Sequence, residues 1–164
     1  MLLLRGVKSN NKKGDSMRHP RPHRHHFPPI PPGESFAFVT NSGGTVNVVS
    51  EGTNVTFPSF QYLGEGITIN QANDRLAVEE PGNYFIDYSV NLNALLDLST
   101  RILINGRPIN ASTIAHEVNR SIFASQMILP LEAGDTISLQ LFDFVGAVTL
   151  LQGAGATINL FRVH

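Results

Sequence analysis

Hydrophobic and polar residues alternate along much of residues 36–164, which is the pattern of strands that bury one face. In the clearest stretch, residues 84–92, every second position is apolar (Tyr84, Ile86, Tyr88, Val90 and Leu92). Residues 135–143 repeat this alternation. The same pattern predicts further strands at residues 36–40, 45–49, 67–70, 74–79, 99–104, 119–129, 147–151 and 155–163.

Turn-forming residues separate the predicted strands, among them Gly43-Gly44, Pro81-Gly82 and Asn105-Gly106. No segment has a convincing helical period; residues 92–98 are the one rival, and they also fit the end of a long strand. Many short strands at regular spacing predict an all-β, antiparallel sandwich or jelly roll. A domain of this length buries roughly 65–70% of its unfolded surface, which is enough for independent stability.

Some predicted strands carry apolar residues on both faces. In residues 119–129, Ile122, Ala124 and Ile128 share one face, whereas Phe123, Met127 and Leu129 share the other. A sandwich strand needs only one buried face, so the second face requires another partner. A bent or barrel-like core and a homo-oligomer interface both supply one, and we favour the interface. Its candidate residues are Phe85, Leu103, Phe123, Met127 and Phe142.

Composition divides the chain into residues 1–35 and residues 36–164. Six of the ten prolines lie between Pro20 and Pro32, and residues 1–35 have a net charge of +5 against −6 for the remainder. Proline and charge with few apolar side chains predict a disordered N-terminal arm. The acidic second part is unlike a nucleic-acid binder, which needs a basic face. Charged residues make up only 15% of the chain, where about 25% is typical, which suits a packed interface.

The first residues of the arm show neither an export signal nor a membrane span. The longest N-terminal apolar run, Met1–Leu4, ends at Arg5, whereas a signal peptide needs roughly 7–15 apolar residues. Residues 1–16 also lack the proline and histidine bias that follows. Lys12-Lys13-Gly14-Asp15 can be encoded by a ribosome-binding sequence just before Met17. An ordinary solvated segment and a translated leader, with the natural start at Met17, are both open interpretations.

The arm also holds the chain's clearest metal-binding candidates, His19, His23, His25 and His26. Neutral imidazoles bind zinc, nickel or copper, but a selective site needs fixed geometry and supporting contacts. An arm without a core supplies neither, and its arginines repel cations. We therefore predict neither a bound metal nor any other cofactor.

Catalytic patterns are absent from the sequence. Cysteine is missing, which excludes disulfides and thiolate catalysis. Residues 36–164 contain two histidines, His116 and His164, and no Gly-x-Ser-x-Gly turn. We therefore predict that the protein is not an enzyme. Calcium needs six to eight oxygens from a shaped loop, and no dense Asp/Asn loop of that kind occurs.

Four motifs together resemble a known superfamily. Residues 81–90 are similar to the Gly-x-Tyr-x-(Ile/Phe)-x-Tyr-x-Val strand of the complement C-one-q and tumour-necrosis-factor-like proteins. Residues 101–106, 131–141 and 153–158 more closely resemble one bacterial branch, the C-terminal domain of BclA, the collagen-like glycoprotein of the Bacillus exosporium. The resemblance covers about residues 36–164.

The resemblance implies a ten-stranded antiparallel jelly roll that assembles as a homotrimer and has no catalytic activity. It implies a structural protein of the spore surface, in exosporium or coat, in contact with other spore-layer proteins and made in the mother-cell cytoplasm. BclA-type proteins carry a Gly-x-y collagen stalk before this domain, whereas residues 1–35 contain only Gly6, Gly14 and Gly33. Residues 27–32 resemble the Leu-Pro-Pro-Ile-Pro-Pro segment of the family's exosporium leader. The alternative function is a trimeric recognition module that binds a carbohydrate or protein through apical loops.

Overall fold

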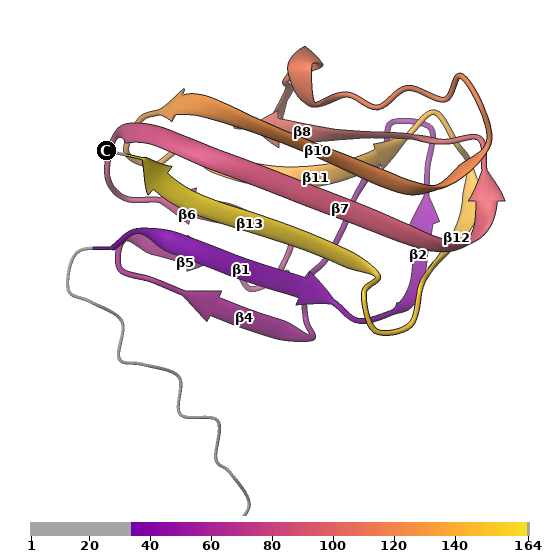
Figure 1. The fold of residues 1–164 in the computed structure, drawn as a ribbon, viewed down its shortest axis with the longest axis horizontal. Coiled ribbons are helices and arrows are strands. Elements are labelled where there is room, and N and C mark those ends of the chain that lie inside the picture. The colour runs from indigo at the N-terminus through magenta and orange to yellow at the C-terminus, as the bar shows by residue number, and fades with distance from the viewer. Residues whose placement is uncertain (1–33, 164) are drawn as a thin grey trace, which may run out of the picture.

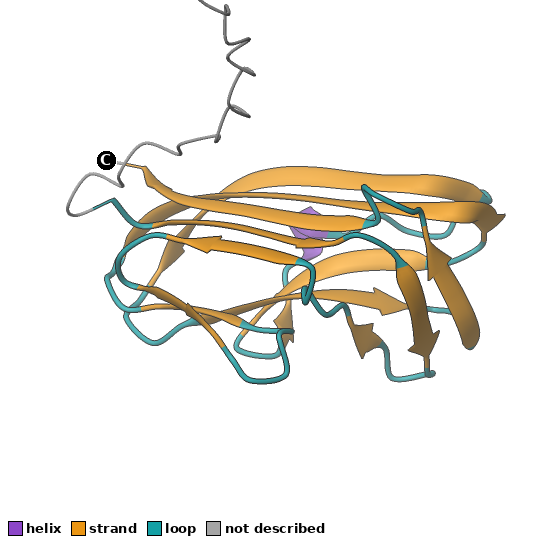
Figure 2. Ribbon diagram, turned by 90° about the horizontal axis from the view of Figure 1, so that it is seen from below, coloured by secondary structure: helices purple, strands orange, loops and turns teal. Residues whose placement is uncertain are grey.

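The computed structural model describes residues 34–163, which form two stacked antiparallel sheets (Figures 1 and 2). A single 3₁₀ turn, η1 (Asn110–Ser112), is the one helical element among these residues. The thirteen strands are β1 (Phe36–Asn41), β2 (Gly44–Val48), β3 (Thr53–Asn54), β4 (Phe60–Leu63), β5 (Ile67–Ile69), β6 (Leu76–Val78), β7 (Gly82–Leu96), β8 (Ser99–Ile104), β9 (Arg107–Pro108), β10 (Arg120–Leu131), β11 (Thr136–Phe142), β12 (Gly146–Leu150) and β13 (Ala156–Val163).

The first sheet is built around β7, its longest strand. Its hydrogen-bonded order is β2-β12-β7-β13-β1-β4, and β10 pairs with the other edge of β7. Figure 1 shows β10, β7, β13, β1 and β4 side by side across the front of the molecule. The first and last strands, β1 and β13, pair with each other, so both ends of the described chain lie in the same sheet.

The second sheet lies behind the first and has the order β5-β6-β11-β8-β9, with β3 added to β11. Figure 2 shows the two layers from the side. Strands that follow one another in sequence repeatedly change sheet, as in a jelly roll. The predicted all-β jelly-roll class is therefore confirmed.

Each of the ten predicted strands has a counterpart in the structure, with ends that differ by a few residues. The strand predicted at 84–92 extends from Gly82 to Leu96, so the segment 92–98 mostly completes a strand and forms no helix. The structure adds β3, β4 and β9, which raises the strand count above the ten that the resemblance implied. All three are short, and two of them have only two residues.

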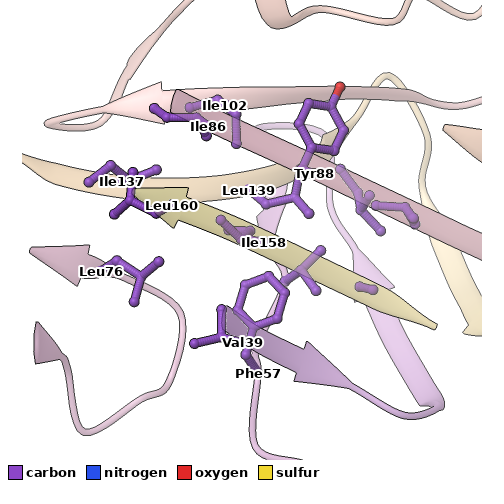
Figure 3. Close-up of a cluster of buried hydrophobic side chains, with 14 of the residues drawn as sticks. Val39, Phe57, Leu76, Ile86, Tyr88, Ile102, Ile137, Leu139, Ile158 and Leu160 are labelled. Carbon is purple, nitrogen blue, oxygen red and sulfur yellow. The ribbon is translucent and has the colours of Figure 1, made fainter. Parts of the chain in front are cut away.

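Alternating side chains from both sheets fill the space between them. The first sheet contributes Tyr84, Ile86, Tyr88 and Val90 from β7. The second contributes alternate residues of β11, Ile137, Leu139 and Leu141, all of them fully buried. Figure 3 shows Ile137 and Leu139 close to Ile158 and Leu160 of β13. These residues belong to one continuous hydrophobic core. The burial of such apolar side chains is the main term that stabilises the fold.

Several predictions fall outside the described residues. They are the disordered arm at residues 1–35, of which only Glu34 and Ser35 are described, the alternative start at Met17, and the metal candidates His19, His23, His25 and His26. The backbone carbonyl of Ser35 accepts a hydrogen bond from the amide of Arg162 at 2.9 Å. Ser35 is therefore tied to β13.

Candidate functional surface on the first sheet

The face of the first sheet that points away from the core carries large apolar side chains. The register of the strands places residues of neighbouring strands opposite one another on this face. Ile128 of β10 is opposite Phe85 of β7, Phe85 is opposite Phe161 of β13, and Phe161 is opposite Phe36 of β1. One apolar row therefore crosses four strands.

Aromatic contacts hold this row together. The rings of Phe85 and Phe161 are stacked with their centroids 4.8 Å apart, and Phe36 packs against Tyr62 of β4 at 5.1 Å. Ile128 and Phe161 nevertheless remain 58% and 45% exposed in the isolated chain. Such a row is costly to leave in water, because each large apolar side chain contributes about 1.5–3 kcal/mol when buried.

The next row of the same face is polar at its centre. Asn159 donates from Nδ2 to the Asp87 carboxylate at 3.0 Å, across the β13–β7 pair. In the row beyond it, the hydroxyls of Ser89 and Thr157 are 2.9 Å apart. Two phenylalanines flank these polar rows, Phe38 and Phe60, with ring centroids 6.1 Å apart. The face thus combines apolar area with polar groups that are already hydrogen-bonded, as protein interfaces do.

Of the five predicted interface residues, Phe85 lies in the apolar row of this face. Phe123 does not, and its prediction is wrong: the ring is fully buried in the subunit's own core, beside Tyr88 and Val90 of the neighbouring strand's core face. Met127 is on the same side of β10 and packs against that core. The face of β10 that remains exposed is the other one, with Ile122 and Ile128.

Leu103 and Phe142 lie on the opposite side of the molecule, on the outer face of the second sheet. Leu103 is 6% exposed but is separate from the main core cluster. The guanidinium of Arg101 lies 3.9 Å from the centre of the Phe142 ring, so a cation–π contact already covers that ring. The five predicted residues therefore occupy three places and form no common surface.

Sequence reasoning missed most of the residues that do form the exposed face. Phe36, Phe38, Phe60 and Phe161 occupy alternate positions in β1, β4 and β13, so the period-two pattern contained the signal. What the pattern lacked was the register, which brings these strands side by side although β1 and β13 stand at opposite ends of the described chain.

A Ser-His-Asp cluster occurs where β8 meets the end of β11, but its geometry does not fit a catalytic triad. Ser99 donates to the Asp143 carboxylate at 3.0 Å, and its hydroxyl lies 3.1 Å from Nδ1 of His116. That same Nδ1 is 3.3 Å from Asp143, whereas a triad uses one ring nitrogen for each partner. Ser99 is also fully buried. The cluster instead fastens the segment after η1 to the β11–β12 turn.

No group of three or more His, Asp or Glu side chains suited to a metal ion occurs within residues 34–163. The acids Asp87 and Asp135, for example, are engaged by Asn159 and Asn105 on different sheets. Within the same part of the chain, no helix has the length and apolar character needed to cross a membrane.

The family model of the BclA C-terminal domain matches residues 36–164. Curated protein sequences gave no match. Among solved structures, Eiger TNF from S. frugiperda has a TM-score of 0.58 at 15% identity, over 80% of this chain and 93% of that one. Murine APRIL at pH 8.5 has a TM-score of 0.59 at 18% identity, over 79% and 99% of the two chains.

These structural likenesses independently support the jelly-roll fold of the tumour-necrosis-factor type, at identities that carry information on fold alone. The family match spans all the strands described above, from β1 to β13. The sequence motifs at 81–90, 101–106, 131–141 and 153–158 fall on β7, β8, the turn into β11, and the start of β13. The chain belongs to the family of the BclA C-terminal domain.

Proposed function

We propose that this protein is a non-catalytic structural component of the bacterial spore surface, in exosporium or outer coat, whose jelly-roll domain assembles as a homotrimer. The observation that carries the proposal is the exposed apolar row of Ile128, Phe85, Phe161 and Phe36 on the first sheet, in a domain of the BclA family. A second copy of the chain is a suitable cover, because copies supply apolar surface of the same kind.

The centre of this face is polar, and its polar groups can also be buried in the contact between copies. Asp87, Asn159, Ser89 and Thr157 are paired within the subunit, so burying them leaves few polar groups without partners. In a trimer each copy presents one surface to the next copy around a closed ring. A stable interface of this type buries well over 1,000 Å² in total, by order of magnitude.

Light scattering of the full chain tests the assembly. We expect a particle of three times the 17.9 kDa chain mass. Ile128→Asp combined with Phe161→Asp should give folded monomer, because each change places a charge in the apolar row. Val145→Asp is the matched control, since Val145 is 72% exposed and lies in the β11–β12 turn, off this face. A stable monomer of the unaltered chain at micromolar concentration would refute the trimer.

Fractionation of spores tests the location. An antibody against the domain should detect the protein in the exosporium or coat fraction, together with the spore-layer proteins that it contacts. Detection in the mother-cell cytoplasm alone, after spores are complete, contradicts the proposed location and leaves the assembly measurement unaffected.

A further inference from the structure

A polar cleft opens on the outer face of the second sheet, on the layer opposite the exposed apolar row. Its volume is about 780 Å³, within the roughly 300–1,000 Å³ of small-molecule sites. The side chains of β11 alternate, so that Ile137, Leu139 and Leu141 enter the core while Ser138 and Gln140 face the cleft. Its walls are residues 51–54, which end in β3, and the turns at residues 74–75 and 105–106.

The floor of the cleft contains a hydroxyl that no group of the described residues engages. Ser138 is 2% exposed, and within residues 34–163 no hydrogen bond engages its hydroxyl. The Ser138 oxygen is not among the buried side-chain atoms without a partner, so its hydroxyl is open to a ligand as donor and as acceptor. Leu103, which is 6% exposed, lies directly opposite Ser138 on β8 and lines the floor beside it. The floor therefore offers one hydroxyl next to the exposed edge of one apolar side chain.

The amides around this floor are held in fixed orientations. Arg101 donates from Nε to Oε1 of Gln140 at 2.8 Å, which leaves the Gln140 NH₂ group available as a donor. Asn54, opposite Gln140 on β3, donates from Nδ2 to Asp74 at 3.2 Å, which leaves its Oδ1 as an acceptor. Fixed groups lose little conformational entropy when a ligand binds.

The turn at residues 49–52 also fits tightly against the cleft. Gly52 has a φ of +93° and lies so close to Gln140 that a Cβ there would come within 2.6 Å of its side chain. The Gly52 amide closes the turn by donating to the Val49 carbonyl at 2.9 Å. This turn therefore gives the cleft wall a defined shape and restricts the position of the Gln140 amide.

The charges at the rim select the class of ligand. Glu51 and Asp74 carry carboxylates and Arg75 a guanidinium, and hydrogen bonds from its own backbone and from Ser50 hold the pKa of Glu51 below its usual 4.5. Two carboxylates disfavour a phosphate or other anion, and Arg75 disfavours a metal cation. Carboxylates, guanidinium, amides and a hydroxyl together match a neutral ligand whose hydroxyl groups both donate and accept.

We infer that this cleft binds a neutral saccharide, with sugar hydroxyls paired to Ser138, Gln140, Asn54 and the rim charges, and a C–H face of the ring against Leu103. The site lies within one subunit and on the sheet opposite the proposed assembly face. It therefore holds for a monomer or a trimer, and for any location of the protein.

Two-dimensional ¹H–¹⁵N NMR of the labelled full chain tests this inference, with neutral methyl hexosides and with dextran as probes at millimolar concentration. We expect saturable shifts at Gly52, Arg75, Ser138 and the side-chain amides of Asn54 and Gln140. Binding of methyl hexosides assigns the site to single or terminal sugars, whereas binding of dextran alone assigns it to a polysaccharide segment; either result supports a saccharide site.

Two matched pairs of variants complete the test. Arg75→Ala and Glu51→Ala should weaken binding about tenfold or more, the loss expected for a hydrogen bond to a charged group. Arg107→Ala and Glu132→Ala, exposed residues outside the cleft lining, should bind as the unaltered chain does. Ser138→Ala should weaken binding while the spectrum outside the cleft stays unchanged. The inference is overturned if no neutral sugar shifts these signals, if inorganic phosphate alone does so, or if Arg75→Ala and Glu51→Ala both bind normally.

Discussion

At the scale of single residues, the neighbours Ile122 and Phe123 show how one strand serves two surfaces. They follow one another in β10, so their side chains point to opposite sides of the first sheet. Ile122 is 65% exposed, whereas Phe123 is completely buried. The Arg120 guanidinium lies 5.9 Å from the Phe123 ring centre and closes that edge of the core.

This pair gives a prediction for stability. Phe123→Ala should lower the free energy of unfolding by about 3–5 kcal/mol, because it removes a buried ring and leaves a cavity. Ile122→Ala should change it by less than about 1 kcal/mol, since exposed positions contribute little to subunit folding. Urea denaturation measures this free energy for the subunit alone when each variant is combined with Ile128→Asp and Phe161→Asp. Equal losses for the two substitutions would contradict the burial of Phe123.

At the scale of elements, Tyr88 joins three of them inside the core. Its hydroxyl donates to the backbone carbonyl of Ser112 in η1 at 2.7 Å and lies 3.0 Å from the hydroxyl of Thr100 in β8. Figure 3 shows the hydroxyl of Tyr88 turned away from the aliphatic cluster. Burial raises the pKa of Tyr88 above its usual 10.0, although the hydrogen bond with Thr100 opposes this shift.

The raised pKa predicts the direction of the pH dependence. Below pH 10 the phenol is protonated in both folded and unfolded chains, so its contribution to stability is fully present. As the pH rises past 10 the unfolded chain loses the proton more readily, and stability falls, by up to about 1.4 kcal/mol per pH unit. Tyr88→Phe should lower stability by about 1–3 kcal/mol at neutral pH and should flatten the decline above pH 10.

Denaturation midpoints on both sides of pH 10 measure both effects. Tyr84 also has a pKa raised by burial, so a smaller decline should remain in Tyr88→Phe. A decline above pH 10 that is as steep in Tyr88→Phe as in the unaltered chain would show that Tyr88 does not cause it.

The elements also show why the sequence predicted the fold better than the surface. Long alternating strands such as β7 and β11 reveal themselves by period alone. The strands β3 and β9 have two residues each and exist only through pairing with β11 and β8, which sequence alone does not show. In β10 both faces are apolar, so the period locates the strand but not its buried side, and Phe123 was placed on the wrong one.

The cleft was beyond sequence reasoning for a similar reason. Its residues come from β3, β8 and β11 and from three turns, and ordinary residues such as Ser138 and Gln140 carry no motif. Only the pairing of Asn54 with Gln140, and of Leu103 with Ser138, brings them together. The inferred site lies on the flank of the second sheet, whereas the recognition site considered from the resemblance lies on apical loops.

At the scale of the whole molecule, the outer faces of the two sheets differ in chemical character. The exposed face of the first sheet is broad and apolar along one row, which favours assembly. The outer face of the second sheet has a polar cleft and an arginine stacked over Phe142, which favours solvent and small ligands. In a trimer built through the first sheet, three clefts remain open on the outside, so each particle presents three saccharide sites.

Assembly through the first sheet predicts that thermal stability depends on protein concentration. A trimer that unfolds to separate chains is favoured by mass action, so its Tm should rise as the concentration increases. The variant with Ile128→Asp and Phe161→Asp should melt at a lower temperature that does not change with concentration, whereas Val145→Asp should follow the unaltered chain. Differential scanning calorimetry over a hundredfold range of concentration measures all three. If the unaltered chain and the double variant both gave a Tm independent of concentration, the apolar row would not be an assembly interface, and its exposed phenylalanines would require a partner other than a second copy.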